Sequence, residues 1–173
     1  MIDTKTEPPA APIHVERSQG ERVWAMGSLF EMKLDASGSH GAFGVMEVTQ
    51  PPGIATPLHV HRREAEAFYV LEGTMIYEAD GQLFHLEAGS FMFLPPGVPH
   101  RFRVTGKEPV RFLGIVVPGG LESLYREVGG PATDGSLPKP TPEETAGEIS
   151  RWGTVAPGYG LEVVGPPLPV DAG

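Results

Sequence analysis

Three histidines and a glutamate stand at spacings that suit a metal centre. One residue separates His59 from His61, Glu66 follows shortly after, and His100 comes after a Pro-Gly turn. In a β-strand, residues i and i+2 point to the same face, so the imidazoles of His59 and His61 project together. Imidazole and carboxylate groups suit divalent transition metals that prefer nitrogen and oxygen donors. These residues are therefore candidate metal ligands.

Short strand-like runs must position these four side chains. The runs are rich in Val, Phe, Tyr and Ile, and several alternate apolar with polar residues, a pattern typical of half-buried strands. They occupy residues 42–49, 66–73, 74–79, 83–88, 90–95, 100–105 and 110–117. Turn residues recur between them, and Asp80-Gly81 is a tight hairpin signal. The pattern predicts an all-β sandwich or barrel.

Two short helices are expected after the strands. Leu121, Leu124, Tyr125 and Val128 share one helical face, and two glycines follow them, so we expect this helix to pack against the barrel. A second helix is predicted from residue 142 to residue 152, with Thr141 as its N-terminal cap.

The distribution of Gly and Pro divides the chain. There are 23 Gly and 19 Pro among 173 residues, and many of them lie near the two ends. We expect an N-terminal arm at 1–22, a barrel with its packing helix at 23–129, and a Gly/Pro-rich tail at 130–173. The last part of that tail, from residue 157, is expected to extend over the surface.

The spacing of the candidate ligands resembles the two motifs of the cupin superfamily. Residues 53–73 read GIATPLHVHRREAEAFYVLEG, and residues 89–104 read GSFMFLPPGVPHRFRV. The Gly, His, Glu and Pro positions of both motifs match, and only Val104 stands where the family pattern has Asn. The resemblance implies a jelly-roll β-barrel with a metal site in its mouth. The implied ligands are His59, His61, Glu66 and His100, with one divalent ion per chain (Ni, Co, Fe, Mn, Cu or Zn).

Residues 22–168 are similar to bacterial single-cupin proteins of the quercetin 2,3-dioxygenase kind. This similarity implies a metal-dependent dioxygenase that cleaves a flavonol or a related enolic aromatic with O₂. In that reaction Glu66 is the expected general base. Part of an aromatic and methionine set is expected to bind the substrate, and the candidates are Met46, Phe68, Met75, Tyr77, Phe93 and Phe102.

Two other classes of function stay open. The same site in a non-oxidative cupin enzyme, such as a cyclase, isomerase or decarboxylase of secondary metabolism, would polarise a carbonyl group. A non-catalytic cupin would only bind a small molecule. Turnover without O₂ would distinguish the first, and ligand binding without any turnover would distinguish the second.

Charged residues near the motifs are expected to lie on the surface. Glu64 does not occupy the glutamate position of the first motif, and we expect it to be a solvated neighbour of Arg62 and Arg63. His85 lies in the middle of a predicted strand and outside both motifs, so we expect it to face outward.

Composition excludes several further classes. A net charge of −9 disfavours nucleic acid as a partner, and the absence of Cys excludes disulfides and thiol chemistry. No apolar stretch is long enough to cross a membrane, and the polar N-terminus does not resemble a signal peptide. We therefore expect a cytoplasmic protein without membrane partners. A homodimer is expected, formed through edge strands and the arm at 1–22.

Overall fold

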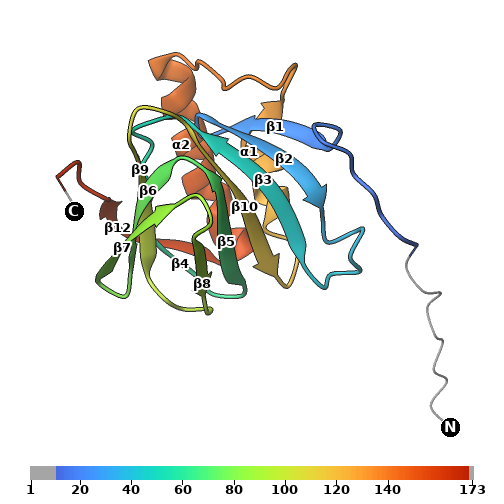
Figure 1. The fold of residues 1–173 in the computed structure, drawn as a ribbon, viewed down its shortest axis with the longest axis horizontal. Coiled ribbons are helices and arrows are strands. Elements are labelled where there is room, and N and C mark those ends of the chain that lie inside the picture. Colours follow the sequence, from blue (N-terminus) through green and yellow to red (C-terminus); the bar gives the residue numbers. More distant parts are fainter. Residues whose placement is uncertain (1–10, 172–173) are drawn as a thin grey trace, which may run out of the picture.

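Two antiparallel sheets face each other and form a barrel (Figure 1) in the computed structural model, which describes residues 11–171. The first sheet has the order β11 (Gly130–Pro131), β1 (Glu21–Ala25), β2 (Ser28–Leu34), β3 (Gly44–Gln50), β10 (Val110–Val117), β5 (Ala65–Glu72), β8 (Phe91–Leu94). The second has the order β12 (Leu161–Pro167), β4 (Pro57–His61), β9 (His100–Thr105), β6 (Thr74–Ala79), β7 (Gln82–Glu87). The predicted all-β class is confirmed.

Alternation with a period of two places the core between the sheets. In β3, β9 and β10, buried residues alternate with partly exposed ones along most of each strand. The buried set fills the barrel with aliphatic, methionine and aromatic side chains, among them Met46, Phe68, Val70, Met75, Tyr77, Phe102, Val104 and Phe112. Burial of these side chains is the main source of the stability of the barrel.

Two turns show why glycine recurs in this chain. Asp80 and Gly81 have φ angles of 50° and 73°, which the tight β6–β7 hairpin requires. Gly73 lies between β5 and β6 at φ 79°. A Cβ atom there would lie 2.6 Å from the carbonyl oxygen of Pro109 and 2.8 Å from Cα of Val110. Only glycine fits this position without a shift of the backbone.

The first predicted helix packs as expected. Helix α1 (Glu122–Val128) follows β10, and Leu121, Leu124 and Val128 are fully buried. Tyr125 turns toward the barrel, where its ring stacks on Phe30 with 4.0 Å between ring centroids. The stripe of apolar residues thus joins the helix to the barrel.

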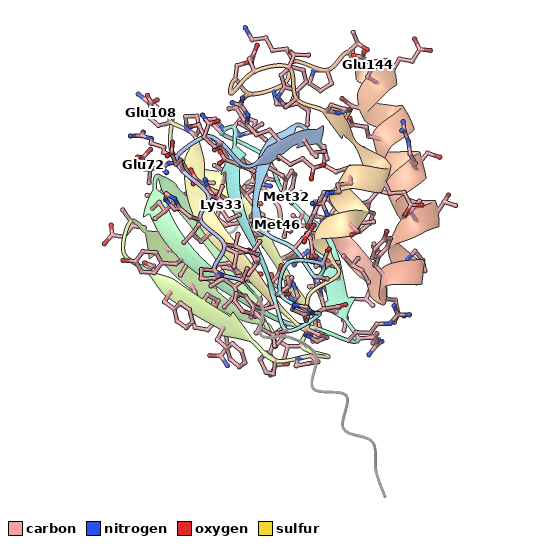
Figure 2. All side chains as sticks on the ribbon, turned by 90° about the vertical axis from the view of Figure 1, so that its right-hand side faces the viewer. Met32, Lys33, Met46, Glu72, Glu108 and Glu144 are labelled. Atoms are coloured by element: carbon pink, nitrogen blue, oxygen red, sulfur yellow. The ribbon has the colours of Figure 1, made fainter. Side chains whose placement is uncertain are left out.

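The second predicted helix is longer than expected. Helix α2 (Pro142–Val155) begins with a capping box, in which Thr141 and Glu144 satisfy each other's backbone N–H groups. It has no buried residue and lies beside α1 on the outside of the molecule (Figure 2), with Glu144 near its upper end. A short 3₁₀ helix, η1 (Ala156–Tyr159), follows it directly.

The end of the chain is part of the barrel. Residues 161–167 form β12, which pairs with β4, so Leu161 lies opposite His61 and Val163 lies opposite His59. The segment is extended and mostly exposed, as expected, but its pairing with β4 as a strand of the smaller sheet was not predicted. Strand β1 likewise starts at Glu21, inside the segment expected to be an arm. Residues 1–10 of that arm lie outside the described residues.

Among residues 11–171, no helix is both long and apolar enough to cross a membrane.

Gly73→Ala should destabilise the barrel by about 3 kcal/mol, because strain at positive φ adds to a backbone clash. Gly89→Ala is the matched control, since Gly89 also has a positive φ of 92° but no atom within 4 Å of the added Cβ. The control should lose only about 1–2 kcal/mol. Urea unfolding followed by circular dichroism measures both. Equal losses for the two variants would contradict the close approach at Gly73.

Candidate metal centre

The candidate ligands come from both sheets. His59 and His61 lie on β4, and His100 begins β9, where it lies directly opposite His59. Glu66 lies on β5 in the other sheet. The period of two along β4 directs both of its histidines inward, as predicted. The four side chains therefore meet where the two sheets face each other.

The four side chains are buried and close together. One nitrogen from each of His59, His61 and His100 can be chosen so that all three lie within 4.8 Å of one another. Oε2 of Glu66 lies 3.3 Å from Nε2 of His100 and 3.7 Å from Nε2 of His61. Three imidazole nitrogens thus gather at one point, and the Glu66 carboxylate lies beside two of them. Nitrogen and oxygen donors of this kind suit a divalent transition metal.

Backbone hydrogen bonds orient two of the rings. Nδ1 of His59 donates to the carbonyl oxygen of Pro57 at 2.7 Å, and Nδ1 of His100 donates to that of Val98 at 2.9 Å. In the neutral tautomer that these bonds select, Nε2 is the nitrogen that can bind a metal. Nε2 of His100 is buried and has no hydrogen-bond partner among the described residues. The site therefore fits a metal ion, which would be the missing partner of this nitrogen.

Burial sets the charge of the cluster. Burial, together with the neighbouring His100 and His61, lowers the pKa of His59 to about 3, against the opposing effects of its hydrogen bond to Pro57 and of Glu66. Burial also lowers the pKa of His61. Burial raises the pKa of Glu66, but His61 and His100 outweigh it and bring that pKa down to about 2. Neutral imidazoles beside an ionised carboxylate are ready to bind a cation.

Glu64 is not the solvated neighbour that the sequence predicted. It is buried, with 6% of its surface exposed, and its Oε2 lies 3.9 Å from Nδ1 of His61. Neither atom has a hydrogen-bond partner among the described residues. Arg62 instead pairs with Glu162, and Arg63 donates to the carbonyl oxygen of Gly158. Glu64 thus lies behind a candidate ligand, near its Nδ1 but without a hydrogen bond to it.

A cavity of about 220 Å³ opens onto His59 and Glu66. Of the six predicted substrate-binding residues, Met46, Phe68, Tyr77 and Phe102 line it. Met75 is buried in the core and is not among the lining residues. Phe93 is 57% exposed on the outer face of β8, so this side chain does not reach the cavity. His85 is exposed, as expected.

The sequence did not predict several parts of the cavity wall. Gln50 lines it from the end of β3, and Tyr125 lines it from α1. Helix α2 contributes Ile149 and Trp152. The carboxylate of Glu148, from the same helix, accepts the backbone N–H of Met26 at 2.8 Å. This bond ties α2 to the β1–β2 turn, so the helix covers one side of the cavity.

We expect His100→Ala to reduce the bound divalent metal to a small fraction of the wild-type content, because it removes the Nε2 atom that has no other partner. His85→Ala, which changes an exposed histidine, should keep the wild-type content. Elemental analysis of the purified, dialysed proteins measures the metal, and circular dichroism checks the fold. Wild-type metal content in His100→Ala would contradict the proposed ligand set.

Glu64→Leu should weaken metal binding by about 10-fold, because a carboxylate beside the far nitrogen of a ligand imidazole helps to hold the ring in place. Glu64→Gln keeps an oxygen acceptor and should retain most of the affinity. Glu162→Leu, at an exposed carboxylate, is the control. Competition with a coloured chelator measures the affinity. If Glu64→Leu and Glu162→Leu bind metal equally well, Glu64 does not position His61.

Comparison with known proteins agrees with this geometry. The family model "Cupin domain" matches residues 46–117. Quercetin 2,3-dioxygenase of Bacillus subtilis is 31% identical over 122 residues, which cover 70% of this chain and 36% of that protein. The chain spans 36% to 55% of the length of the first three curated relatives.

Solved structures share the barrel. A predicted oxalate decarboxylase from Thermotoga maritima is 26% identical with a TM-score of 0.54, covering 61% of this chain and 99% of that one. An RmlC-like cupin from Shewanella frigidimarina is 19% identical with a TM-score of 0.54, covering 65% of this chain and 96% of that one. The barrel is thus a cupin jelly roll, and the chain belongs to the cupin superfamily.

Proposed function

We propose that the chain is a metal-dependent dioxygenase that cleaves a flavonol, with quercetin as the reference substrate, or a related enolic aromatic. The observation that carries this proposal is the cavity beside the candidate ligands. It is walled mostly by apolar and aromatic side chains and it reaches His59 and Glu66. Similarity to the Bacillus subtilis quercetin 2,3-dioxygenase supports the same reaction class.

The charge of the cavity favours a neutral aromatic ligand. None of the described residues that line it is Lys or Arg, and two of them, Glu66 and Glu148, are acidic. Phosphate and carboxylate groups are usually bound by Arg or Lys. Sugar phosphates and dicarboxylic acids therefore find no partner in the wall, whereas a planar phenolic ligand needs none.

The aromatic walls suit a flat ring system. The ring of Phe68 lies 5.2 Å from that of Phe112 and 5.4 Å from that of Tyr77, measured between centroids. Tyr77 in turn stacks on Phe102 at 5.6 Å. Such rings bind planar ligands by offset and edge contacts. They also keep water from the reacting atoms.

When bound, a divalent metal supplies a Lewis acid that stabilises a deprotonated substrate hydroxyl group. The chain itself supplies the general base and the side chains that hold the metal in place. Glu66 is ionised at neutral pH, because its pKa is about 2. Its carboxylate faces both the candidate ligands and the cavity, so Oε2 can accept the hydroxyl proton of the ligand. His59 and His100 stay fixed by their backbone hydrogen bonds.

Metal-loaded protein should consume quercetin and O₂ together, with loss of the flavonol absorbance and release of carbon monoxide. Glu66→Gln should lose at least 100-fold in rate, roughly the contribution of a general base. Glu87→Gln changes an exposed carboxylate on β7 and should keep the wild-type rate. An oxygen electrode and absorbance spectroscopy measure the reaction.

Other outcomes of this experiment point to the other functions. No O₂ uptake and no loss of absorbance would contradict the flavonol proposal. Turnover of a panel of enolic aromatics without O₂ would support a non-oxidative cyclase, isomerase or decarboxylase. Binding without turnover by any route, unchanged in Glu66→Gln, would support a non-catalytic binding protein.

A homodimer in the cytoplasm remains part of the proposal. Strand β8 lies at an edge of the larger sheet, and it exposes the rings of Phe91 and Phe93. Exposed apolar side chains on an edge strand favour pairing with a second copy. Light scattering after size-exclusion chromatography should give twice the chain mass of 18.5 kDa.

A further inference from the structure

Gln50 is a buried polar side chain that neither the fold nor the proposed chemistry uses. It is the last residue of β3, and 6% of its surface is exposed. Its Oε1 atom has no hydrogen-bond partner among the described residues. The side chain lines the same cavity as His59 and Glu66.

An unpaired amide in this place weakens the folded state. A buried acceptor that leaves water without a new partner loses its hydrogen bonds, and such atoms are rare in folded proteins. An apolar residue of similar size would fill the same space without this loss. Because the Gln50 amide faces a cavity rather than packed core, a bound ligand is the partner that would pair with it.

Strand register places Gln50 far from Glu66, one of the candidate ligands. Gly44, at the other end of β3, pairs with Val116 of β10, and Val116 pairs with Glu66. Gln50 pairs instead with Val110, six residues earlier on β10. One cavity nevertheless reaches both Glu66 and Gln50. A ligand that contacts both must be elongated and must carry polar groups at two separate places.

We propose that Gln50 recognises a neutral hydroxyl group on the part of the ligand that lies away from the metal centre. This inference rests on the proposed function and narrows its substrate class to elongated aromatics with more than one hydroxyl group. An amide can both accept from and donate to a phenol hydroxyl. A negatively charged group finds no cationic partner at this end, because no described lining residue is Lys or Arg and Val48 and Ile54 are apolar neighbours in the wall.

Two flavonols test the recognition. Quercetin carries hydroxyl groups on its outer rings, whereas 3-hydroxyflavone has only the enolic hydroxyl group that the metal centre would take. Anaerobic titrations of metal-loaded wild type, Gln50→Leu and Gln82→Leu, followed by tryptophan fluorescence, give the affinities without turnover. Gln82 lies exposed on β7, and its variant is the matched control.

Gln50→Leu should bind quercetin roughly 2- to 10-fold more weakly, the effect of one neutral hydrogen bond. Its affinity for 3-hydroxyflavone should stay unchanged, and Gln82→Leu should match wild type with both ligands. The melting temperature of unliganded Gln50→Leu should rise, since the unpaired amide is gone. A purely structural role for Gln50 would lower it instead.

Three results would overturn the inference. If Gln50→Leu loses affinity equally for both flavonols, or keeps its affinity for quercetin, Gln50 does not bind the hydroxyl group on the outer rings. A lower melting temperature would show that the amide has a structural partner. In these cases the proposed function is not contradicted, provided that the wild-type protein binds quercetin. If wild type binds neither flavonol, the proposed function fails, and the role of Gln50 fails with it.

Discussion

The structure depends on the burial of four ionisable side chains at one point of an apolar barrel. Three imidazoles and the carboxylate of Glu66 lie almost entirely out of water. Burial of a charge is unfavourable unless an opposite charge and hydrogen bonds compensate for it. His59 and His61 meet this constraint by favouring the neutral form, since burial lowers the pKa of both. A divalent cation would satisfy all four side chains together, so metal binding and folding are expected to stabilise each other.

The end of the chain binds to the sheet that carries the three histidines, through strand pairing and through two arginines. Strand β12 covers one side of β4, which carries His59 and His61. From β9, Arg101 donates to the carbonyl oxygen of Pro166 at 2.9 Å, and Arg103 donates to that of Leu168 at 2.9 Å. Arg101 and Arg103 of β9 therefore anchor the C-terminal segment. Its strand β12 in turn pairs with β4, which carries His59 and His61.

Local rules made the centre of the site predictable from the sequence. Strand period placed His59 and His61 on one face, and the Asp80-Gly81 turn closes the β6–β7 hairpin, in which Ala79 lies opposite His100. Features that depend on contacts between distant parts of the chain could not be predicted from the sequence. Glu64 lies between two strands, where no period fixes its direction, and it turned inward. Phe93 follows the period of β8, but the strand lies at the edge and its outer face is open. Strand β12 pairs with a segment about 100 residues earlier, which no local pattern reveals.

The position of β12 decides which edges of the barrel remain open. It is the outermost strand of the smaller sheet, and Pro166 and Pro167 near its end have no N–H to offer a further strand. Extension of that sheet is therefore blocked on the side next to the metal centre. Strand β7, at the other edge of the same sheet, and β8, at an edge of the larger sheet, carry no proline within the strands. Pairing of a second copy along β8, as proposed, would therefore leave β12 in place beside the strand that carries His59 and His61.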